Sequence, residues 1–150
     1  MKNHRIEKQI ELKAPVSRVW RALTNHREFG LWFGVKLKSP FKVGKSTRGP
    51  ITYPGFEHIE MEVVVQKIEP ETYFSYTWHP FAIDPAVDYS KEAPTLVEFR
   101  LDEKKGGTLL VVIETGFDRI PAGRRLKAFR MNREGWAEQL ISIKKYVAKK

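Results

Sequence analysis

Four glutamates lie within predicted β-strands, at positions where a side chain points either to solvent or into the protein: Glu60, Glu62, Glu98 and Glu114. A carboxylate that faces a dry cavity has a raised pKa and can serve as a general acid or base. The strand pattern favours the alternative, a solvated outer face of the sheet. No HExxH or GxSxG motif selects any of them, so no residue is assigned a catalytic role.

The sequence contains no convincing motif for a metal site or a nucleotide site. Its four histidines, at positions 4, 26, 58 and 79, do not pair at metal-ligand spacing. The absence of cysteine excludes disulfides, thiol nucleophiles and Cys-based metal sites. The GKST stretch at 44–47 resembles the end of a phosphate-binding loop, but Ser39 stands where that motif needs glycine. We therefore predict no metal and no cofactor.

An arginine interrupts an apolar stripe near the end of the chain. Phe129, Arg133, Trp136 and Leu140 are spaced four, three and four residues apart, so they share one face of a predicted helix. Two interpretations are open. Arg133 snorkels from the edge of an ordinary core, or the helix lines a cavity that is not fully packed.

Aromatic residues are concentrated on the predicted strand 72–79, where Tyr76 and Trp78 share a face. Such side chains can simply fill a core, or they can line an apolar ligand pocket that holds a few polar groups. The loop that follows, from Pro80 to Pro94, is long for a compact domain, and long loops are often functional. His79 sits beside this loop and is expected either to face a pocket or to be hydrogen-bonded at the strand end.

The elements that must position these residues follow from periodicity and turn signals. An alternating strand over 4–13 precedes a helix from Pro15 to about Asn25 and a short helical piece over 27–33. Short strands and turns fill 34–55, a hairpin joins the last two strands, and one long helix runs from Pro121 to about Val147. Longer strands are predicted at 60–68, 72–79, 95–102 and 108–115. Segregated strands and helices indicate an α+β fold with an antiparallel sheet, on which the long helix buries its stripe.

Composition favours one domain covering residues 1–150. No apolar run approaches the roughly 18 residues of a membrane span, and the first residues lack the apolar region of a signal peptide. We therefore expect a cytoplasmic protein without a transmembrane segment. The net charge is +9, and residues 124–150 alone contribute nine Lys/Arg against two Glu. This basic helix is either a solvated outer face or a surface for an anionic partner.

Several stretches resemble the helix-grip superfamily that includes START and Bet v 1-type proteins (SRPBCC), and most closely its branch related to the C-terminal domain of the activator of Hsp90 ATPase. The resemblance covers nearly the whole chain. It rests on IELKAPVSRVWRALTN (10–25) with the following LWF, FKVGK (41–45), EVVVQKIEP (62–70), YFSYTW (73–78) and EGWAEQLISIKKYV (134–147).

The resemblance implies a curved antiparallel sheet wrapped around the C-terminal helix, with two short helices after the first strand and a deep cavity between sheet and helix. On that basis we expect a small hydrophobic ligand, such as a lipid, polyketide or flavonoid-like molecule. Trp136 and Leu140 would wall the cavity beside Tyr76, Trp78 and Phe129, and Arg133 would be the polar anchor for an anionic group. The alternatives are a co-chaperone-like module that binds a chaperone or another protein, and a cyclase- or hydrolase-type enzyme in the same cavity. Nucleic-acid binding is disfavoured because no known nucleic-acid-binding fold is indicated.

Overall fold

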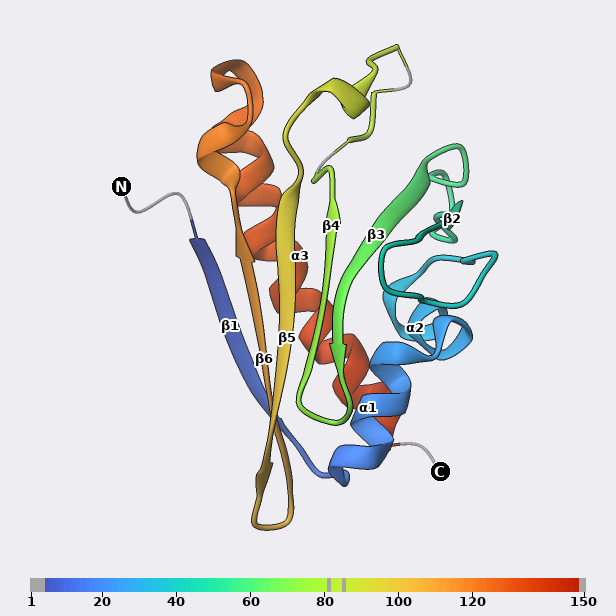
Figure 1. The fold of residues 1–150 in the computed structure, drawn as a ribbon, viewed down its shortest axis with the longest axis vertical. Coiled ribbons are helices and arrows are strands. Elements are labelled where there is room, and N and C mark those ends of the chain that lie inside the picture. The colour runs from blue at the N-terminus through green and yellow to red at the C-terminus, as the bar shows by residue number, and fades with distance from the viewer. Residues whose placement is uncertain (1–4, 81, 85, 149–150) are drawn as a thin grey trace.

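A computed structural model describes residues 5–80, 82–84 and 86–148. The strands form one antiparallel sheet in the order β1-β6-β5-β4-β3-β2. The expected α+β fold with a curved antiparallel sheet is confirmed (Figure 1). The strands are β1 (Arg5–Leu12), β2 (Ser46–Pro50), β3 (Glu60–Glu69), β4 (Tyr73–Trp78), β5 (Thr95–Lys104) and β6 (Gly107–Thr115).

Two short helices follow β1, as expected: α1 (Val16–Thr24) and α2 (His26–Phe33). Asn25 separates them and starts α2, because its side-chain oxygen accepts hydrogen bonds from the main-chain N–H groups of Arg27 and Glu28. Gly34 ends α2 in a left-handed conformation with φ of 97°, which glycine adopts without steric penalty. Two short 3-10 helices, η2 (Tyr89–Lys91) and η3 (Phe117–Arg119), lie in connections.

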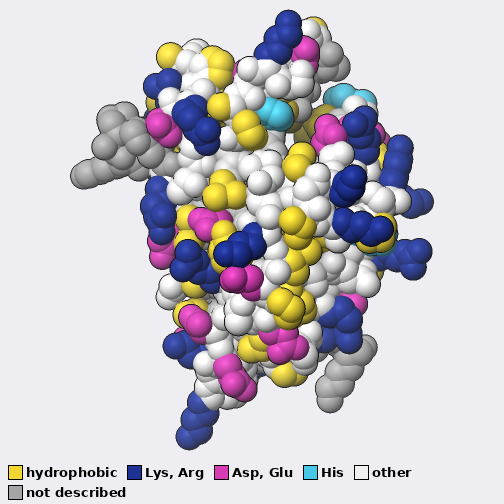
Figure 2. Space-filling view, viewed as in Figure 1, with side chains coloured by type: hydrophobic (Ala, Val, Ile, Leu, Met, Phe, Trp, Pro, Cys, Tyr) yellow, Lys and Arg dark blue, Asp and Glu magenta, His cyan; other side chains and the backbone are white. Residues whose placement is uncertain are grey.

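The long helix α3 (Ala122–Ala148) crosses one face of the sheet, which lies in front of it in Figure 1. Its apolar stripe is buried, as the spacing predicts: Phe129, Trp136, Leu140, Ile143 and Val147 are all core residues. The opposite face of the sheet faces the viewer in Figure 2, where Lys/Arg and Asp/Glu side chains of both signs are interspersed with apolar ones. The sheet is therefore packed on one face and solvated on the other, as is common for antiparallel sheets.

The helices are joined to one another by polar contacts. Glu28 of α2 accepts hydrogen bonds from Arg18 of α1 (2.7 Å) and from the hydroxyl of Tyr146 in α3 (2.9 Å). The Ser142 hydroxyl and the Gln139 amide nitrogen of α3 donate to the main-chain oxygens of Trp32 and Phe33. These contacts hold the end of α2 against the middle of α3, which is where the candidate site lies.

The boundaries of the elements differ from the sequence prediction by at most a few residues. The predicted first strand begins at His4, which lies outside the described residues, and so do Phe81 and Pro85 of the long loop. No helix in the described part of the chain is long and apolar enough to cross a membrane.

Candidate functional site

A hollow of about 510 Å³, here called the outer pocket, opens at the end of the sheet where β4 stops. It is enclosed by Phe33 at the end of α2, by the segment 51–62, by the end of β4 and by residues of the long loop. Its walls are mainly aromatic and aliphatic. The aromatic and aliphatic side chains that line it include Phe33, Tyr53, Phe56, Trp78, Ile83 and Tyr89.

A smaller hollow of about 140 Å³, here called the inner pocket, lies next to it against α3. Both pockets are lined by Phe33 and Trp78, whose ring centroids are 5.9 Å apart. These two rings therefore stand between the outer and the inner pocket. The remaining walls of the inner pocket come from one face of α3: Asn132, Gly135, Trp136 and Gln139.

A buried carboxylate, Glu114 of β6, lies behind the indoles of these pockets. Its side chain is 0 % exposed. Trp78 and Trp136 each donate an indole N–H to it at 2.8 Å, one to each carboxylate oxygen. The Asn132 amide donates at 2.9 Å and the Thr95 hydroxyl donates to the same oxygen as Trp78. Four elements, namely β4, β5, β6 and α3, are thus joined at one carboxylate.

The charge of Glu114 is stabilised by neutral donors alone, because no ion pair to it is found among the described residues. Burial raises the pKa of the Glu114 carboxyl, and the hydrogen bonds from Thr95, Trp78, Asn132 and Trp136 partly oppose that rise. Burial also raises the pKa of the Tyr76 hydroxyl, with a further contribution from the negative charge of Glu114. With its raised pKa, the Glu114 carboxyl could exchange a proton, although the indoles of Trp78 and Trp136 cover it.

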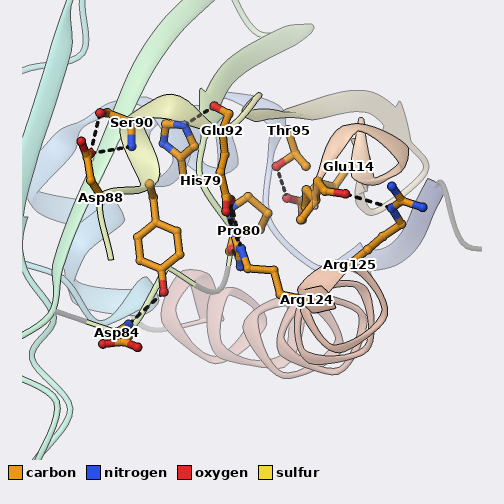
Figure 3. A network of polar contacts seen from close by, with 12 residues as sticks. His79, Pro80, Asp84, Asp88, Ser90, Glu92, Thr95, Glu114, Arg124 and Arg125 are labelled. Carbon is orange, nitrogen blue, oxygen red and sulfur yellow. Dashed lines mark hydrogen bonds and ion pairs between the residues drawn. The ribbon is translucent and has the colours of Figure 1, made fainter. Parts of the chain in front are cut away.

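The connection between β4 and β5 is fastened to the start of α3 (Figure 3). The Arg124 guanidinium contacts the Glu92 carboxylate with both Nε and Nη2, the shortest distance being 2.6 Å, and Nη1 donates to the Pro80 carbonyl at 3.0 Å. It also lies over the Tyr89 ring, 4.7 Å from the centroid. His79 contributes a hydrogen bond to the Glu92 carbonyl at 2.9 Å. Arg124 therefore has partners inside the chain, and it holds Tyr89 at the rim of the outer pocket.

Two other hollows of similar volume have a different character. One, on the solvated face of the sheet, is lined by charged side chains such as Lys67, Glu98 and Arg100. The other lies beside α2 and is bounded by His26 and Leu31. Neither reaches the aromatic residues around Glu114, so the paired outer and inner pockets are the better candidate site.

The structure brings three of the sequence-predicted site residues together. The Trp78 ring lies 5.6 Å from Tyr76 and 5.8 Å from Trp136, measured between centroids. Trp78 lines both pockets and Trp136 lines the inner one. Tyr76 is completely buried behind them. Leu140 and Phe129 are buried in the core of α3, Phe129 against Phe117, and neither lines a pocket.

Arg133 is not placed as the resemblance implied. Its side chain is exposed, its guanidinium lies over the Phe129 ring at 5.6 Å, and it lines neither pocket. Arg133 therefore snorkels from the edge of the stripe, because a guanidinium retains its hydration there while its stem covers an aromatic ring. The polar residue on the inner side of this turn is Asn132. Periodicity could have suggested it, since Asn132 lies four residues before Trp136.

The expected cavity also differs in position. The outer pocket is lined by no residue of α3, and only the inner pocket reaches that helix. Bulky side chains such as Phe99, Trp136 and Leu140 fill most of the space between sheet and helix. The pockets remain at the end where α2, the loop and the strands diverge. Phe33 and Gln139 were missed because no local pattern distinguishes them from core or surface residues.

An open, curved antiparallel sheet with two short helices after its first strand and one long C-terminal helix across one face defines the helix-grip (SRPBCC) class. Within that class the chain belongs to the family of Activator of Hsp90 ATPase homolog 1-like proteins, whose family model matches residues 13–148. No curated protein matches the chain at a significant level.

Solved structures with the same fold are similar over nearly the whole chain. MLL2253 from Mesorhizobium loti is 22% identical, with a TM-score of 0.76 and 97% of each chain covered. The Aha1 dimer from Colwellia psychrerythraea is 17% identical, with a TM-score of 0.70 and 95% of each chain covered. DynU16, a protein of the dynemicin biosynthetic locus, is 22% identical with a TM-score of 0.74; 97% of this chain is covered, which spans about half (48%) of DynU16. At these identities the similarity concerns the fold.

Proposed function

We propose that this protein binds a small apolar or amphipathic molecule, of the lipid, polyketide or flavonoid-like kind, in the outer pocket. The observation that carries the proposal is the pocket itself. Its volume of about 510 Å³ lies within the roughly 300–1,000 Å³ that is usual for small-molecule sites. A cytoplasmic location and a single ligand-binding domain belong to the same proposal, and the absence of cysteine supports a reducing compartment.

Exposed apolar side chains at the pocket rim support this proposal. Tyr53, Phe56 and Ile83 are 48, 51 and 42 % exposed, and all three line the outer pocket. A ligand that covered them would remove apolar area from water, which is favourable by about 25 cal/mol per Å². The Tyr53 hydroxyl donates to the Phe33 carbonyl at 2.9 Å, so this wall is oriented before a ligand arrives.

Native mass spectrometry of the purified protein, with a solvent extract of the same sample, tests the proposal. We expect an additional mass that the extract identifies. Ile83→Glu, which places a charge on the apolar rim, should lower the retained fraction. Ile141→Glu is the matched control, because Ile141 is 52 % exposed on α3 and lines neither pocket. A protein that carries no ligand and takes up none from lipids or flavonoids would contradict the proposal.

Catalysis in the same pockets is a second candidate, and the buried carboxylate favours it. Glu114 contacts the indoles of Trp78 and Trp136, both of which line a pocket. A carboxyl with a raised pKa suits general acid–base work of the cyclase or hydrolase kind. Comparison of the ligand masses released by the wild type and by Glu114→Gln tests it. Identical masses would leave binding as the function, whereas a precursor retained only by the variant would support turnover.

A co-chaperone-like role is supported by family membership and by the charge of α3. Arg130, Arg133, Lys144 and Lys145 of this helix are exposed, and such a basic surface suits an acidic partner protein. Isothermal titration of the protein with purified Hsp90 tests this role directly. Binding that is lost in a Lys144→Glu/Lys145→Glu variant would support it, and an absence of heat at micromolar concentrations would count against it.

A further inference from the structure

We propose that the ligand carries a protonated amine, which sits in the inner pocket beside Gln139 while the apolar body occupies the outer pocket. This inference rests on the proposed binding function and adds the chemical class of the head group. It replaces the anionic head group that an inward-facing Arg133 would have implied.

The residues described around the two pockets include carboxylates but no basic side chain of the lysine or arginine type. The chain holds 27 Lys and Arg residues, yet none of the described residues that line either pocket is a lysine or an arginine. The outer pocket is lined instead by Glu60, Glu62 and Asp88. Arg48 lies within 3.7 Å of Glu60 and 3.1 Å of Glu62, so part of that charge is compensated.

Asp88 supplies further negative charge; hydrogen bonds from Ser90 and, to a smaller extent, the charge of His79 lower the pKa of its carboxyl. Its carboxylate accepts hydrogen bonds from the main chain and hydroxyl of Ser90, and it makes no ion pair within the described residues. Among the described lining residues, a bound anion would therefore meet three carboxylates and one histidine, but no lysine or arginine. A bound ammonium group would meet the opposite sign, which is the arrangement that favours its binding.

The Gln139 side chain, which lines the inner pocket, has a hydrogen-bond acceptor that is unpaired among the described residues. Gln139 lines this pocket, and its amide nitrogen donates to the Phe33 carbonyl at 2.9 Å. This contact fixes the orientation of the amide, because a carbonyl can only accept. The Gln139 Oε1 atom is then buried without a hydrogen-bond partner in the described structure. An ammonium group has three donors and no acceptor, so it fits that atom and a carboxylate does not.

The aromatic walls of the inner pocket favour the same class of ligand. The rings of Phe33, Trp78 and Trp136 all line this small pocket, and an aromatic ring attracts a cation that approaches its face. The Glu114 carboxylate lies behind both indoles without a cationic partner. It adds negative potential behind the indoles that line the pocket, so Glu114 and the Gln139 acceptor both favour a positive charge there.

Gly135 provides the space through which a head group reaches this position. It lies in the interior of α3, where glycine is less favourable than alanine. A Cβ atom built there would meet no other atom within 4 Å, so no close packing requires glycine. Gly135 is itself one of the residues that line the inner pocket. A side chain at this position would occupy the pocket without breaking the helix.

Isothermal titration with three matched probes tests the inference: phenylbutylamine, phenylbutanol and phenylbutyrate at pH 7. We expect the amine to bind about tenfold or more tightly than the carboxylate, since one charge-assisted hydrogen bond is worth at least that factor. This order is opposite to the one that the net charge of +9 would give by itself. The alcohol, which donates but carries no charge, should fall between them.

Two variants locate the amine. Gly135→Leu should weaken amine binding at least about tenfold. Gly123→Leu is the matched control and should leave it unchanged, because Gly123 lies in the same helix, has equally open space and lines neither pocket. Gln139→Met keeps the length of the side chain but removes the acceptor, so the preference for amine over alcohol should decrease. Circular dichroism confirms that each variant is folded.

The outcomes separate this inference from the proposed function. If phenylbutyrate or phenylbutanol binds as tightly as the amine, the pocket binds apolar molecules but the amine inference is wrong. If the amine is preferred but Gly135→Leu binds it like the wild type, the inner pocket is not its site and the inference is also wrong. If none of the probes binds at millimolar concentration, the inference is overturned, whereas the proposed function is decided by native mass spectrometry of the purified protein.

Discussion

Replacement of Glu114 by glutamine removes one acceptor atom from the most connected polar group in the protein. One carboxylate oxygen accepts from Trp78 and Thr95, and the other accepts from Trp136 and Asn132. Asn132 also reaches the oxygen that accepts from Trp78, at 3.2 Å, and the Thr95 hydroxyl can turn to accept from an amide N–H. Whichever oxygen becomes the amide nitrogen, one indole N–H therefore loses its acceptor and faces a new amide N–H, which leaves two buried donors opposed. A buried donor left unsatisfied costs about 1–3 kcal/mol, and relief from burying a charge offsets part of this. We therefore expect Glu114→Gln to lower the free energy of unfolding by about 2–4 kcal/mol.

Urea unfolding at pH 7, followed by circular dichroism, measures this difference. For a chain of this size each kcal/mol shifts the melting temperature by about 2–4 °C, so a drop of roughly 5–15 °C accompanies it. Glu103→Gln is the matched control, because Glu103 is an exposed glutamate at the end of β5. It should change the free energy of unfolding by less than about 0.5 kcal/mol.

The pH dependence provides a second readout for the same residue. Burial raises the pKa of Glu114 in the folded protein above its ordinary value, so the folded state binds the proton more tightly than the unfolded state. The stability that Glu114 contributes is then complete below the ordinary pKa and decreases as the pH rises through the folded pKa. The stability difference between wild type and Glu114→Gln should therefore shrink as the pH rises through this range. A variant as stable as the wild type, or a difference that grows over this range, would refute the reasoning.

Three further predictions follow from contacts outside this cluster. Glu28→Gln should destabilise the protein by about 1–2 kcal/mol at pH 7, as measured by urea unfolding. Burial raises the pKa of the Glu28 carboxyl, but hydrogen bonds from Arg18 and Tyr146 lower it overall. The destabilisation should therefore decrease as the pH drops through the pKa of Glu28 in the folded protein. Gly135→Ala should stabilise the protein by about 0.5–1 kcal/mol. Gly30→Ala should destabilise it, because the added Cβ would lie 2.2 Å from the Val35 carbonyl oxygen. Thermal melting of both variants tests the two predictions. Arg124→Met should release the connection between β4 and β5, and hydrogen exchange at the amides of residues 89–92 should then become at least about tenfold faster.

The fold could be predicted from the sequence because its elements carry strong and consistent signals. The apolar spacing from Phe129 to Val147 indicated a helix, and the alternation around Val97 and Phe99 indicated a strand. The order of strands and helices then left few topologies. The same order, with one long apolar stripe to bury, placed α3 on the sheet, and the resemblance to the helix-grip class agreed with that placement.

The site was harder to predict because it depends on which side of an element faces inward. Glu114 was one of four candidate carboxylates, but β6 is apolar on both faces, so alternation could not select it. Arg133 and Asn132 flank the same stripe, and a difference of one position along the helix decides which of them reaches the core. The acceptor at Gln139 exists only because the main chain of α2 ends beside it, a contact between residues 106 positions apart in the chain.

The half-exposed residues at the rim of the outer pocket and the buried residues around Glu114 have different consequences for how such a protein can diversify. Exchanges at Phe56 or Ile83 alter the shape of the pocket but touch few core atoms, so they leave folding nearly intact. Exchanges at Trp136 or Glu114 disturb the joint between sheet and helix. A chain built in this way can acquire new ligands by drift at its rim while its architecture persists. Solved structures with TM-scores near 0.75 at only about one-fifth identity show how far sequences can diverge while this fold is kept.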